Sequence, residues 1–365
     1  MGLLDYYRQF EGLSEEEVNA ELRRKAAERR ERALAQVDPI DLSQTTWPEL
    51  PPSSVVNAVT YIARRGLHRY LDPHASELRG ELAAEHGVDA AQVVVGNGAA
   101  QLLAAAAHAL MEPGDELVTP WPSYPLYPIM ARRARGRAVP VGGFGVEPIV
   151  RAINERTRLV ALCNPNDPTG ELVSTAELDE LLGALPERVV VLLDEALGDY
   201  ADRPRDESLA LLERHPRLLI FRTFSKAWGL AGLRCGYAIG APDAEPLLER
   251  LEPELGLNEL AQAGVLEALR STRGTVTRRV AAIRAERTRM LGELRALRLE
   301  VADSQANVVW FARPGVDGAD LAARLERAKV IVAAGARFGD DTRVRAALQS
   351  PAAGDRLLQA LRSVL

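Results

Sequence analysis

The stretch that decides the fold covers residues 218–237 and reads LLIFRTFSKAWGLAGLRCGY. Its apolar start predicts a buried strand, and the hydroxyl-rich turn that follows carries Lys226, with Arg234 further along. A lysine amine can condense with a carbonyl to form a Schiff base, and Arg234, Thr223 and Ser225 offer charge and hydroxyl groups to a phosphate. Lys226 is therefore the first candidate for chemistry, although a surface lysine beside a salt-bridging arginine would give the same local pattern.

Around this stretch, short apolar runs alternate with helix-length segments from residue 55 to residue 239. The alternation predicts an α/β fold, with a mostly parallel sheet flanked by helices on both faces. Ligands of such sheets gather at the carboxyl ends of the strands. The predicted strands are 92–96, 116–119, 138–141, 159–163, 189–193, 218–222 and 237–239, with helices at 55–65, 75–86 and 99–110.

The two ends of the chain have different patterns. Ser14 and Glu17 form a capping box before an Arg/Glu-rich helix that reaches about Val37. Beyond residue 271 a long charged helix is followed by short strands and two further helices, which predicts a smaller α+β domain. We expect three parts: an N-terminal helical arm at 1–44 that joins the small domain or a dimer surface, a large domain at 45–270 and a small domain at 271–365.

Composition excludes several functional classes. The 365 residues include 45 basic and 51 acidic side chains, for a net charge of −6, which argues against nucleic-acid binding. No apolar run approaches membrane-spanning length. Cys163 and Cys235 fit neither a disulfide framework nor a metal motif, and the five histidines show no ligand pairing. We expect a cytoplasmic protein without a metal site.

Two motifs follow the first predicted strands. Residues 96–101 read GNGAAQ and open a helix whose free N–H groups can bind a phosphate. Gln101 stands where a dinucleotide-binding fingerprint would have its third glycine, and turn glycines before helices are common. Residues 121–125 read WPSYP, so Tyr124 is held between prolines where it can stack on a planar ring, or simply be buried.

Two further motifs follow the next strands. Residues 164–170 read NPNDPTG, and the two prolines and the glycine fix a loop at the edge of the sheet. Residues 192–196 read LLDEA and place Asp194 at the end of an apolar strand, where its burial requires a partner. A pyridinium nitrogen would be such a partner, whereas a helix-capping aspartate would give the same pattern.

In this order the motifs resemble the fold-type I enzymes that depend on pyridoxal 5'-phosphate, specifically the class I/II aminotransferase superfamily and its histidinol-phosphate aminotransferase branch. The resemblance implies that Lys226 forms the Schiff base with the cofactor and acts as the acid and base of the proton shift. It implies that Asp194 pairs with the pyridine nitrogen and that Tyr124 stacks on the ring. The implied phosphate ligands are Ala99, Ala100, Thr223, Ser225 and Arg234.

The resemblance also implies a homodimer and a substrate site. Tyr70 matches the tyrosine that reaches across the dimer interface toward the partner's cofactor. Arg345 matches the arginine that binds the substrate α-carboxylate, and Asn307 sits where the family has an asparagine near the substrate. Arg343 should face the other way, because alternate residues of a strand do so.

Three positions depart from the family pattern. Asp167 and Leu197 replace an asparagine and a tyrosine that donate to the cofactor's 3'-oxygen, so Asp167 must take a proton, turn away or be bridged. If Asp167 stays charged, it should raise the pKa of the Schiff base. Histidinol-phosphate enzymes carry an arginine for the substrate's phosphate near the position of Ala333, and alanine cannot bind a phosphate. Arg337 is the nearby alternative for this role, although a surface role for it is as compatible with the sequence.

The sequence therefore predicts an aminotransferase that exchanges an amino group between an amino acid and a 2-oxo acid. A decarboxylase or lyase on the same fold is the alternative, because both usual donors to the 3'-oxygen are missing. A scaffold without catalytic activity is a third, which the joint presence of Lys226, Asp194, Tyr124 and Arg345 opposes. The identity of the donor and acceptor is left open.

Overall fold

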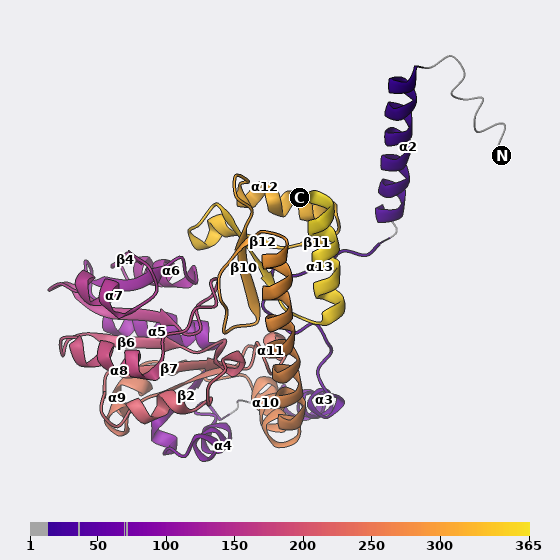
Figure 1. Ribbon diagram of the computed structural model, residues 1–365. Helices are drawn as coiled ribbons and strands as arrows, with labels where there is room; N and C mark the ends of the chain where they lie inside the picture. Colours follow the sequence, from indigo (N-terminus) through magenta and orange to yellow (C-terminus); the bar gives the residue numbers. More distant parts are fainter. Residues whose placement is uncertain (1–13, 36, 69, 71) are drawn as a thin grey trace.

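A seven-stranded sheet forms the centre of the molecule in the computed structural model, which describes residues 14–35, 37–68, 70 and 72–365 (Figure 1). Six strands are parallel, and β8 runs against its neighbours β2 and β7. The predicted α/β fold with a mostly parallel sheet is confirmed. In sheet order the strands are β2 (Val93–Gly96), β8 (Gly236–Ile239), β7 (Leu218–Thr223), β6 (Val190–Asp194), β5 (Thr157–Cys163), β3 (Glu116–Trp121) and β4 (Arg137–Gly142).

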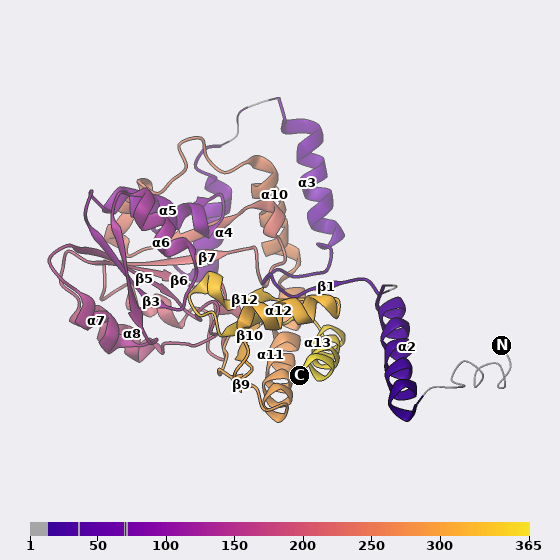
Figure 2. The same cartoon turned by 90° about the horizontal axis from the view of Figure 1, so that it is seen from above.

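Helices cover both faces of this sheet (Figures 1 and 2). The central strands are apolar on both sides, as strands of a parallel sheet between two helical layers must be. One core contains α5 (Ala99–Leu110) and α6 (Leu126–Arg133). The other contains α4 (Ser76–His86), α8 (Thr175–Ala184) and α10 (Glu259–Ser271). Shorter or peripheral elements are α3 (Ser53–Gly66), α7 (Val146–Ala152), α9 (Glu245–Glu249), η1 (Ala90–Gln92), η2 (Gly198–Tyr200), η3 (Glu207–Leu211), η4 (Ala231–Leu233) and η5 (Pro242–Ala244).

The C-terminal part builds a second, four-stranded sheet. Its order is β12 (Ala333–Ala334), β13 (Arg343–Ala347), β10 (Val308–Ala312) and β9 (Glu300–Val301), and every pair is antiparallel. The long helix α11 (Arg273–Ala296) connects α10 to this sheet. Packed against this sheet are α12 (Gly318–Arg327) and η6 (Gly335–Phe338), and α13 (Pro351–Val364) packs against α11 and α12.

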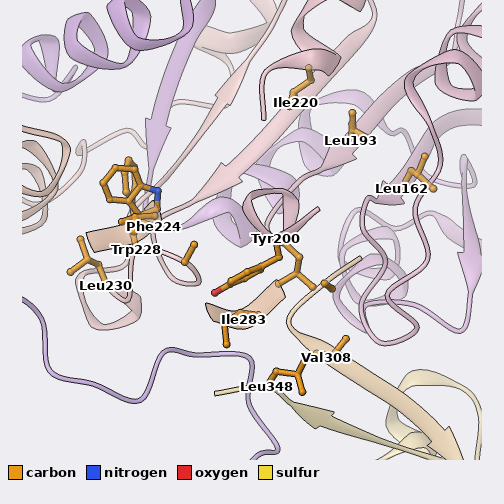
Figure 3. Close-up of a cluster of buried hydrophobic side chains, with 14 of the residues drawn as sticks. Leu162, Leu193, Tyr200, Ile220, Phe224, Trp228, Leu230, Ile283, Val308 and Leu348 are labelled. Carbon is orange, nitrogen blue, oxygen red and sulfur yellow. The ribbon is translucent and has the colours of Figure 1, made fainter. Parts of the chain in front are cut away.

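One hydrophobic core spans the two sheets. Ile220 and Leu193 of the large sheet belong to the same cluster of buried side chains as Ile283 of α11 and Val308 of the small sheet (Figure 3). Tyr200 lies between these groups in that view, and Phe224 lies to one side beside Trp228. The strand ends of the large sheet are thereby held against the small sheet, so that a site can form between them.

The N-terminal segment returns to the C-terminal part. Strand β1 (Ile40–Asp41) pairs in parallel with β11 (Val330–Ile331), and residues 42–47 continue toward the carboxyl ends of the large sheet. Helix α2 (Glu15–Ala35) precedes β1 and stands away from the body in both views (Figures 1 and 2). Its predicted capping box is present, since the amide of Glu17 donates to Ser14 Oγ at 3.3 Å and that of Ser14 to Glu17 Oε2 at 2.8 Å.

Across the described residues, none of the helices has the length and apolar character needed to cross a membrane. The division into parts at 1–44, 45–270 and 271–365 stays a prediction, because the fold by itself does not test where an independently folding unit begins or ends.

Candidate active site

The carboxyl ends of the parallel strands open onto a cavity of about 280 Å³. Because β2, β3, β5, β6 and β7 point the same way, the motifs that follow them converge at one edge of the sheet. Most of the side chains predicted to hold the cofactor line this one cavity. They are Ala99, Ala100, Tyr124, Asp167, Asp194, Thr223, Ser225, Lys226 and Arg234.

Lys226 lies just beyond the end of β7, and its Nζ donates to Thr45 Oγ1. Burial lowers the pKa of Lys226, an effect that the charge of Asp167 partly opposes. A lysine with a lowered pKa is more often neutral, and the neutral amine is the form that attacks a carbonyl. The position of Lys226 therefore suits a Schiff-base residue.

An anion-binding cradle surrounds the start of α5. Ser225 Oγ accepts from Thr223 Oγ1 at 3.1 Å and from Arg234 Nη1 at 3.5 Å. Gly98 caps α5 with φ of +87°, and a Cβ there would lie 2.7 Å from Arg234 Nη2. The cradle thus combines free amides at a helix start, two hydroxyls and a guanidinium, which fits a phosphate dianion.

Asp194 ends β6 and is only 3 % exposed. Its oxygens accept from Tyr127 Oη at 3.0 Å and from the amide of Ala196 at 3.0 Å. Burial nevertheless raises the pKa of Asp194 to about 6. The charge of Lys226 and the two hydrogen bonds oppose this rise but do not offset burial, and a buried carboxylate of this kind that faces a cavity fits the N–H of a pyridinium ring.

The loop at residues 164–170 is fixed by its own asparagines. Asn164 exchanges hydrogen bonds with the backbone of Val173 at 2.9 and 2.8 Å, and Asn166 Oδ1 accepts from Ser123 Oγ at 2.7 Å. Directly after Asn166 the loop presents Asp167, whose two oxygens accept from Arg345 Nη1 at 2.6 and 2.8 Å. Asp167 has turned toward β13, which is one of the three arrangements that the sequence left open.

The two predicted substrate residues, Arg345 and Asn307, both contact the segment at residues 43–45. Arg345 on β13 is 4 % exposed, and its Nη2 also donates to the carbonyl of Ser43 at 2.5 Å. Asn307 Nδ2 donates to the carbonyl of Thr45 at 3.3 Å. Among the described residues, Arg345 Nε and Asn307 Oδ1 are buried and have no hydrogen-bond partner, as expected of groups that receive a ligand.

Arg343 and Arg337 lie apart from this pair. Arg343 forms ion pairs with Glu300 at 3.4 Å and with Asp340 at 3.3 Å, so it faces away from Arg345 as expected. Arg337 is exposed, with its guanidinium 4.9 Å from the centre of the Phe338 ring. Ala333 is the register partner of Arg345, so the position opposite this arginine carries no charge.

Tyr70 is not brought into the cavity of its own chain, and its side chain is 100 % exposed. Leu197, by contrast, is buried and lines the cavity. The predicted contact of Tyr70 with a partner's cofactor stays a prediction.

Sequence reasoning missed the segment at residues 42–47. Gln44 and Thr46 line the cavity, Thr45 contacts Lys226, and Ser43 contacts Arg345. Trp47 fixes the end of the segment, because the guanidinium of Arg279 lies 4.8 Å from the centre of its ring. The hydroxyl-rich run SQTT at 43–46 was the available signal, but the partners of Thr45 and Ser43 are about 180 and 300 residues away in the chain.

A buried charge network beneath the site was also missed. Arg222 donates from Nη2 to Glu195 Oε2 at 2.8 Å and from Nη1 to Asp206 Oδ1 at 2.5 Å. Glu195 in turn accepts from Arg203 at 2.8 Å. His86 lies 3.1 Å from Asp206, and burial lowers the pKa of this histidine. The network anchors the residue next to Asp194 and so helps to position that carboxylate.

The chain matches the family described as "Aminotransferase class I and II" over residues 37–361. It is a class I and II aminotransferase. The match confirms the predicted activity class, and together with the solved structure of a relative in complex with the cofactor it confirms the dependence on pyridoxal 5'-phosphate.

Aromatic amino acid and histidinol-phosphate aminotransferases are both among the relatives of this aminotransferase. An aromatic amino acid aminotransferase of Cutibacterium acnes is 37% identical over 88% of this chain and 91% of the relative. A histidinol-phosphate aminotransferase of Thiobacillus denitrificans is 38% identical over 92% of this chain and 88% of the relative. The predicted likeness to the histidinol-phosphate branch is confirmed, with aromatic amino acid enzymes standing beside it.

Solved structures of aminotransferases share the fold of this chain. Histidinol-phosphate aminotransferase from Sinorhizobium meliloti, solved in complex with pyridoxal 5'-phosphate, superposes with a TM-score of 0.81 at 25% identity, over 93% of this chain and 95% of that one. Aspartate aminotransferase from Thermus thermophilus, solved with maleate, gives a TM-score of 0.80 at 26% identity, over the full length of both chains.

Proposed function

We propose that Lys226, Asp194 and Arg234 hold pyridoxal 5'-phosphate in the cavity at the carboxyl edge of the large sheet. The observation that carries this proposal is that one cavity is lined by a lysine of lowered pKa, a buried carboxylate and an anion cradle. Each of the three suits a different part of the cofactor: the aldehyde, the ring nitrogen and the phosphate.

The bound cofactor supplies a conjugated ring that withdraws electrons from the bonds at the substrate's amine-bearing carbon. Lys226 supplies the amine for covalent attachment and later moves a proton at Nζ, for which its lowered pKa is suited. Asp194 would accept a hydrogen bond from the ring N–H, and Tyr127 Oη and the Ala196 amide keep its carboxylate in place. Tyr124 provides an aromatic wall of the cavity.

The cofactor's phosphate is assigned to the cradle of Thr223, Ser225 and Arg234 at the start of α5, next to Ala99 and Ala100. The helix start contributes amide donors and the positive end of the helix dipole. This anchor lies on the large sheet, so that the ring would be held between two fixed ends, the phosphate at the cradle and the nitrogen at Asp194.

The substrate is assigned to the end of the cavity lined by Gln44, Thr46 and Asp167, behind which Arg345 contacts Asp167 and Asn307 contacts Thr45. Within the part of the chain that the structure describes, Arg345 Nε and Asn307 Oδ1 are buried without a hydrogen-bond partner, which favours a polar ligand there. We propose an aromatic amino acid as amino donor, following the names of several relatives. Histidinol phosphate is less favoured, because Ala333 brings no cation opposite Arg345 and Arg337 is exposed and stacked on Phe338.

A homodimer and a cytoplasmic location belong to the same proposal. The dimer is supported by exposed apolar side chains on and after α3, among them Tyr61, Leu67 and Tyr70. The cytoplasmic location is supported by Cys163 and Cys235, which are both buried and free. The division into an arm, a large domain and a small domain is retained as a working description.

A half-reaction screen tests the assignment of function. The holoenzyme is mixed with single amino acids, including phenylalanine and tyrosine, and with histidinol phosphate, while cofactor absorbance is followed. We expect phenylalanine and tyrosine to convert the cofactor to its amino form, which persists until a 2-oxo acid is added. Lys226→Ala should bind the cofactor without covalent attachment and slow the conversion by at least about a thousandfold.

The same screen separates transamination from decarboxylation. A decarboxylase would release carbon dioxide and return to the starting absorbance without a 2-oxo acid. That result would refute the aminotransferase assignment, and conversion by histidinol phosphate alone would refute the proposed aromatic donor.

A further inference from the structure

Asp167 and Arg345 form a buried ion pair at the substrate end of the cavity. Arg345 Nη1 lies 2.6 and 2.8 Å from the two carboxylate oxygens, so one nitrogen serves both of them. Asp167 is 8 % exposed and Arg345 4 %. A buried carboxylate neutralises a buried guanidinium here, and removing either partner would leave the other without its counter-charge.

The two partners are placed differently with respect to the cavity. Asp167 is among the residues that line it together with Lys226, whereas Arg345 is not. A ligand carboxylate that enters beside Lys226 therefore meets Asp167 before it reaches the guanidinium. Arg345 still has a donor to offer, since within the described chain its buried Nε has no partner.

The surroundings of Asp167 decide what happens when a second carboxylate arrives. Its neighbours by charge are Lys226 after β7, Asp194 at the end of β6, Tyr124 after β3 and Cys163 at the end of β5. Arg345 on β13 is the cation in direct contact. Two carboxylates at one guanidinium repel each other, and such pairs usually retain a proton between them.

We propose that Asp167 makes carboxylate binding proton-linked: it stays ionised on Arg345 when the ligand group there is neutral, and it takes up one proton when a carboxylate binds. The inference rests on the proposed function, in which Arg345 receives the substrate carboxylate. The proton comes from solvent and adds to a carboxylate oxygen of Asp167, and no covalent bond of the protein breaks. One site thereby accepts both carboxylate and neutral ligand groups.

Calorimetry of the holoenzyme tests this with two matched ligands that lack an amine and cannot react. The probes are 3-phenylpropanoate and its neutral analogue 3-phenylpropanamide, each titrated at about pH 8 in buffers that differ in ionisation enthalpy. The dependence of the binding enthalpy on the buffer gives the number of protons taken up. The Schiff base also titrates, so its own protonation is followed by cofactor absorbance and subtracted.

In the wild-type enzyme we expect about one proton beyond the Schiff-base contribution for the acid and none for the amide. Because binding takes up a proton, affinity for the acid should fall by up to about tenfold for each unit of rising pH. In Asp167→Asn the extra proton should disappear, and the acid should bind at least about tenfold more tightly at pH 8, with little change for the amide.

Equal proton uptake for acid and amide in the wild-type enzyme overturns the proposal, whatever the variant does. So does an acid affinity that is unchanged in Asp167→Asn, or acid binding that is absent from both proteins. Acid binding that appears only in the variant supports it, because Asp167 is then what opposes the carboxylate. Failure of the amino acid screen with intact proton linkage would reject the proposed reaction and leave the linkage standing.

Discussion

The surroundings of Asp194 have opposing effects on the pKa of its carboxyl group. Two hydrogen bonds, from Tyr127 and from the Ala196 amide, favour the ionised form, but burial outweighs them and raises the pKa to about 6. The folded protein therefore binds a proton at Asp194 more tightly than the unfolded chain does. Burial thus makes ionisation of Asp194 unfavourable in the apoenzyme. A cationic ring nitrogen bound beside Asp194 would stabilise the ionised carboxylate and so offset this cost.

This shift predicts how the apoenzyme's free energy of unfolding depends on pH. Because the folded pKa is raised from 3.8 to about 6, the contribution of Asp194 falls as pH rises through that window, by about 3 kcal/mol in total. Asp194→Asn removes the ionised form, so its apoenzyme should become progressively more stable than the wild type from about pH 4 to pH 7. Denaturant unfolding of both apoproteins measures the difference.

The exposed Asp243→Asn serves as the matched control for loss of one carboxylate. Unfolding curves for wild type and Asp194→Asn that keep a constant separation across this pH range would contradict the argument. In the holoenzyme the order should reverse, because the amide offers the ring nitrogen no charge.

At the scale of elements, the site depends on how α5 begins. Gly98 holds a positive φ at the helix start, and its missing Cβ leaves room for the guanidinium of Arg234. Arg234 itself has a φ of +54° at the end of η4, an unusual conformation for a side chain of its size. The anion cradle is therefore formed by two adjacent turns, each with a residue of positive φ, Gly98 in one and Arg234 in the other.

Gly98→Ala should disturb the close approach of Arg234 to residue 98. The new Cβ would lie 2.7 Å from Arg234 Nη2 and would sit on a residue with φ of +87°. We expect a loss of about 1 kcal/mol in stability, and a cofactor affinity reduced by about tenfold through the displaced arginine. Titration of the apoenzyme with pyridoxal 5'-phosphate measures the affinity.

Gly80→Ala in α4 is the control, because nothing lies within 4 Å of the added Cβ. It should stabilise the protein by about 0.5–1 kcal/mol and leave cofactor affinity unchanged. An unchanged affinity in Gly98→Ala would show that the cradle does not need this close approach.

The large sheet and most of the residues that line the cavity could be predicted from the sequence, because both depend on local patterns. The strand that ends at Asp194 and the turn with Lys226 are predicted by apolar runs and by the polar or turn-forming residues that end them. A parallel sheet then brings the carboxyl ends of its strands together at one edge. The contact of Thr45 with Lys226 and that of Asp167 with Arg345 could not be predicted in this way. Their partners lie in distant elements, and only the packing of the second sheet brings them within reach.

At the scale of the whole molecule, several large apolar side chains are exposed on and near α3. Val56 and Tyr61 of α3, and Leu67 and Tyr70 after it, are exposed by between 46% and 100%. Leu255 is 86% exposed and precedes α10, which packs against α3. Exposed apolar side chains concentrated in this way are typical of a surface that is covered in the assembled protein.

Light scattering should therefore give about twice the monomer mass of 39.7 kDa, as expected for a dimer. Leu67→Glu places a charge on this surface and should weaken self-association by about tenfold or more, with little effect on folding of the single chain. Gly183→Glu, at an open position of α8, is the control. A monomeric wild-type protein, or a Leu67→Glu variant that associates as strongly as the wild type, would exclude this surface as the interface.

The segment at residues 42–47 has a consequence for biosynthesis. It is made well before the residues that hold it, because Leu42 is hydrogen-bonded to Ile331 and Ala347, and Ser43 to Arg345. The segment cannot take its place across the site until β13 has been synthesised. In a nascent chain released before β13, Lys226 would therefore lack the fixed hydroxyl of Thr45 that contacts it in the folded protein.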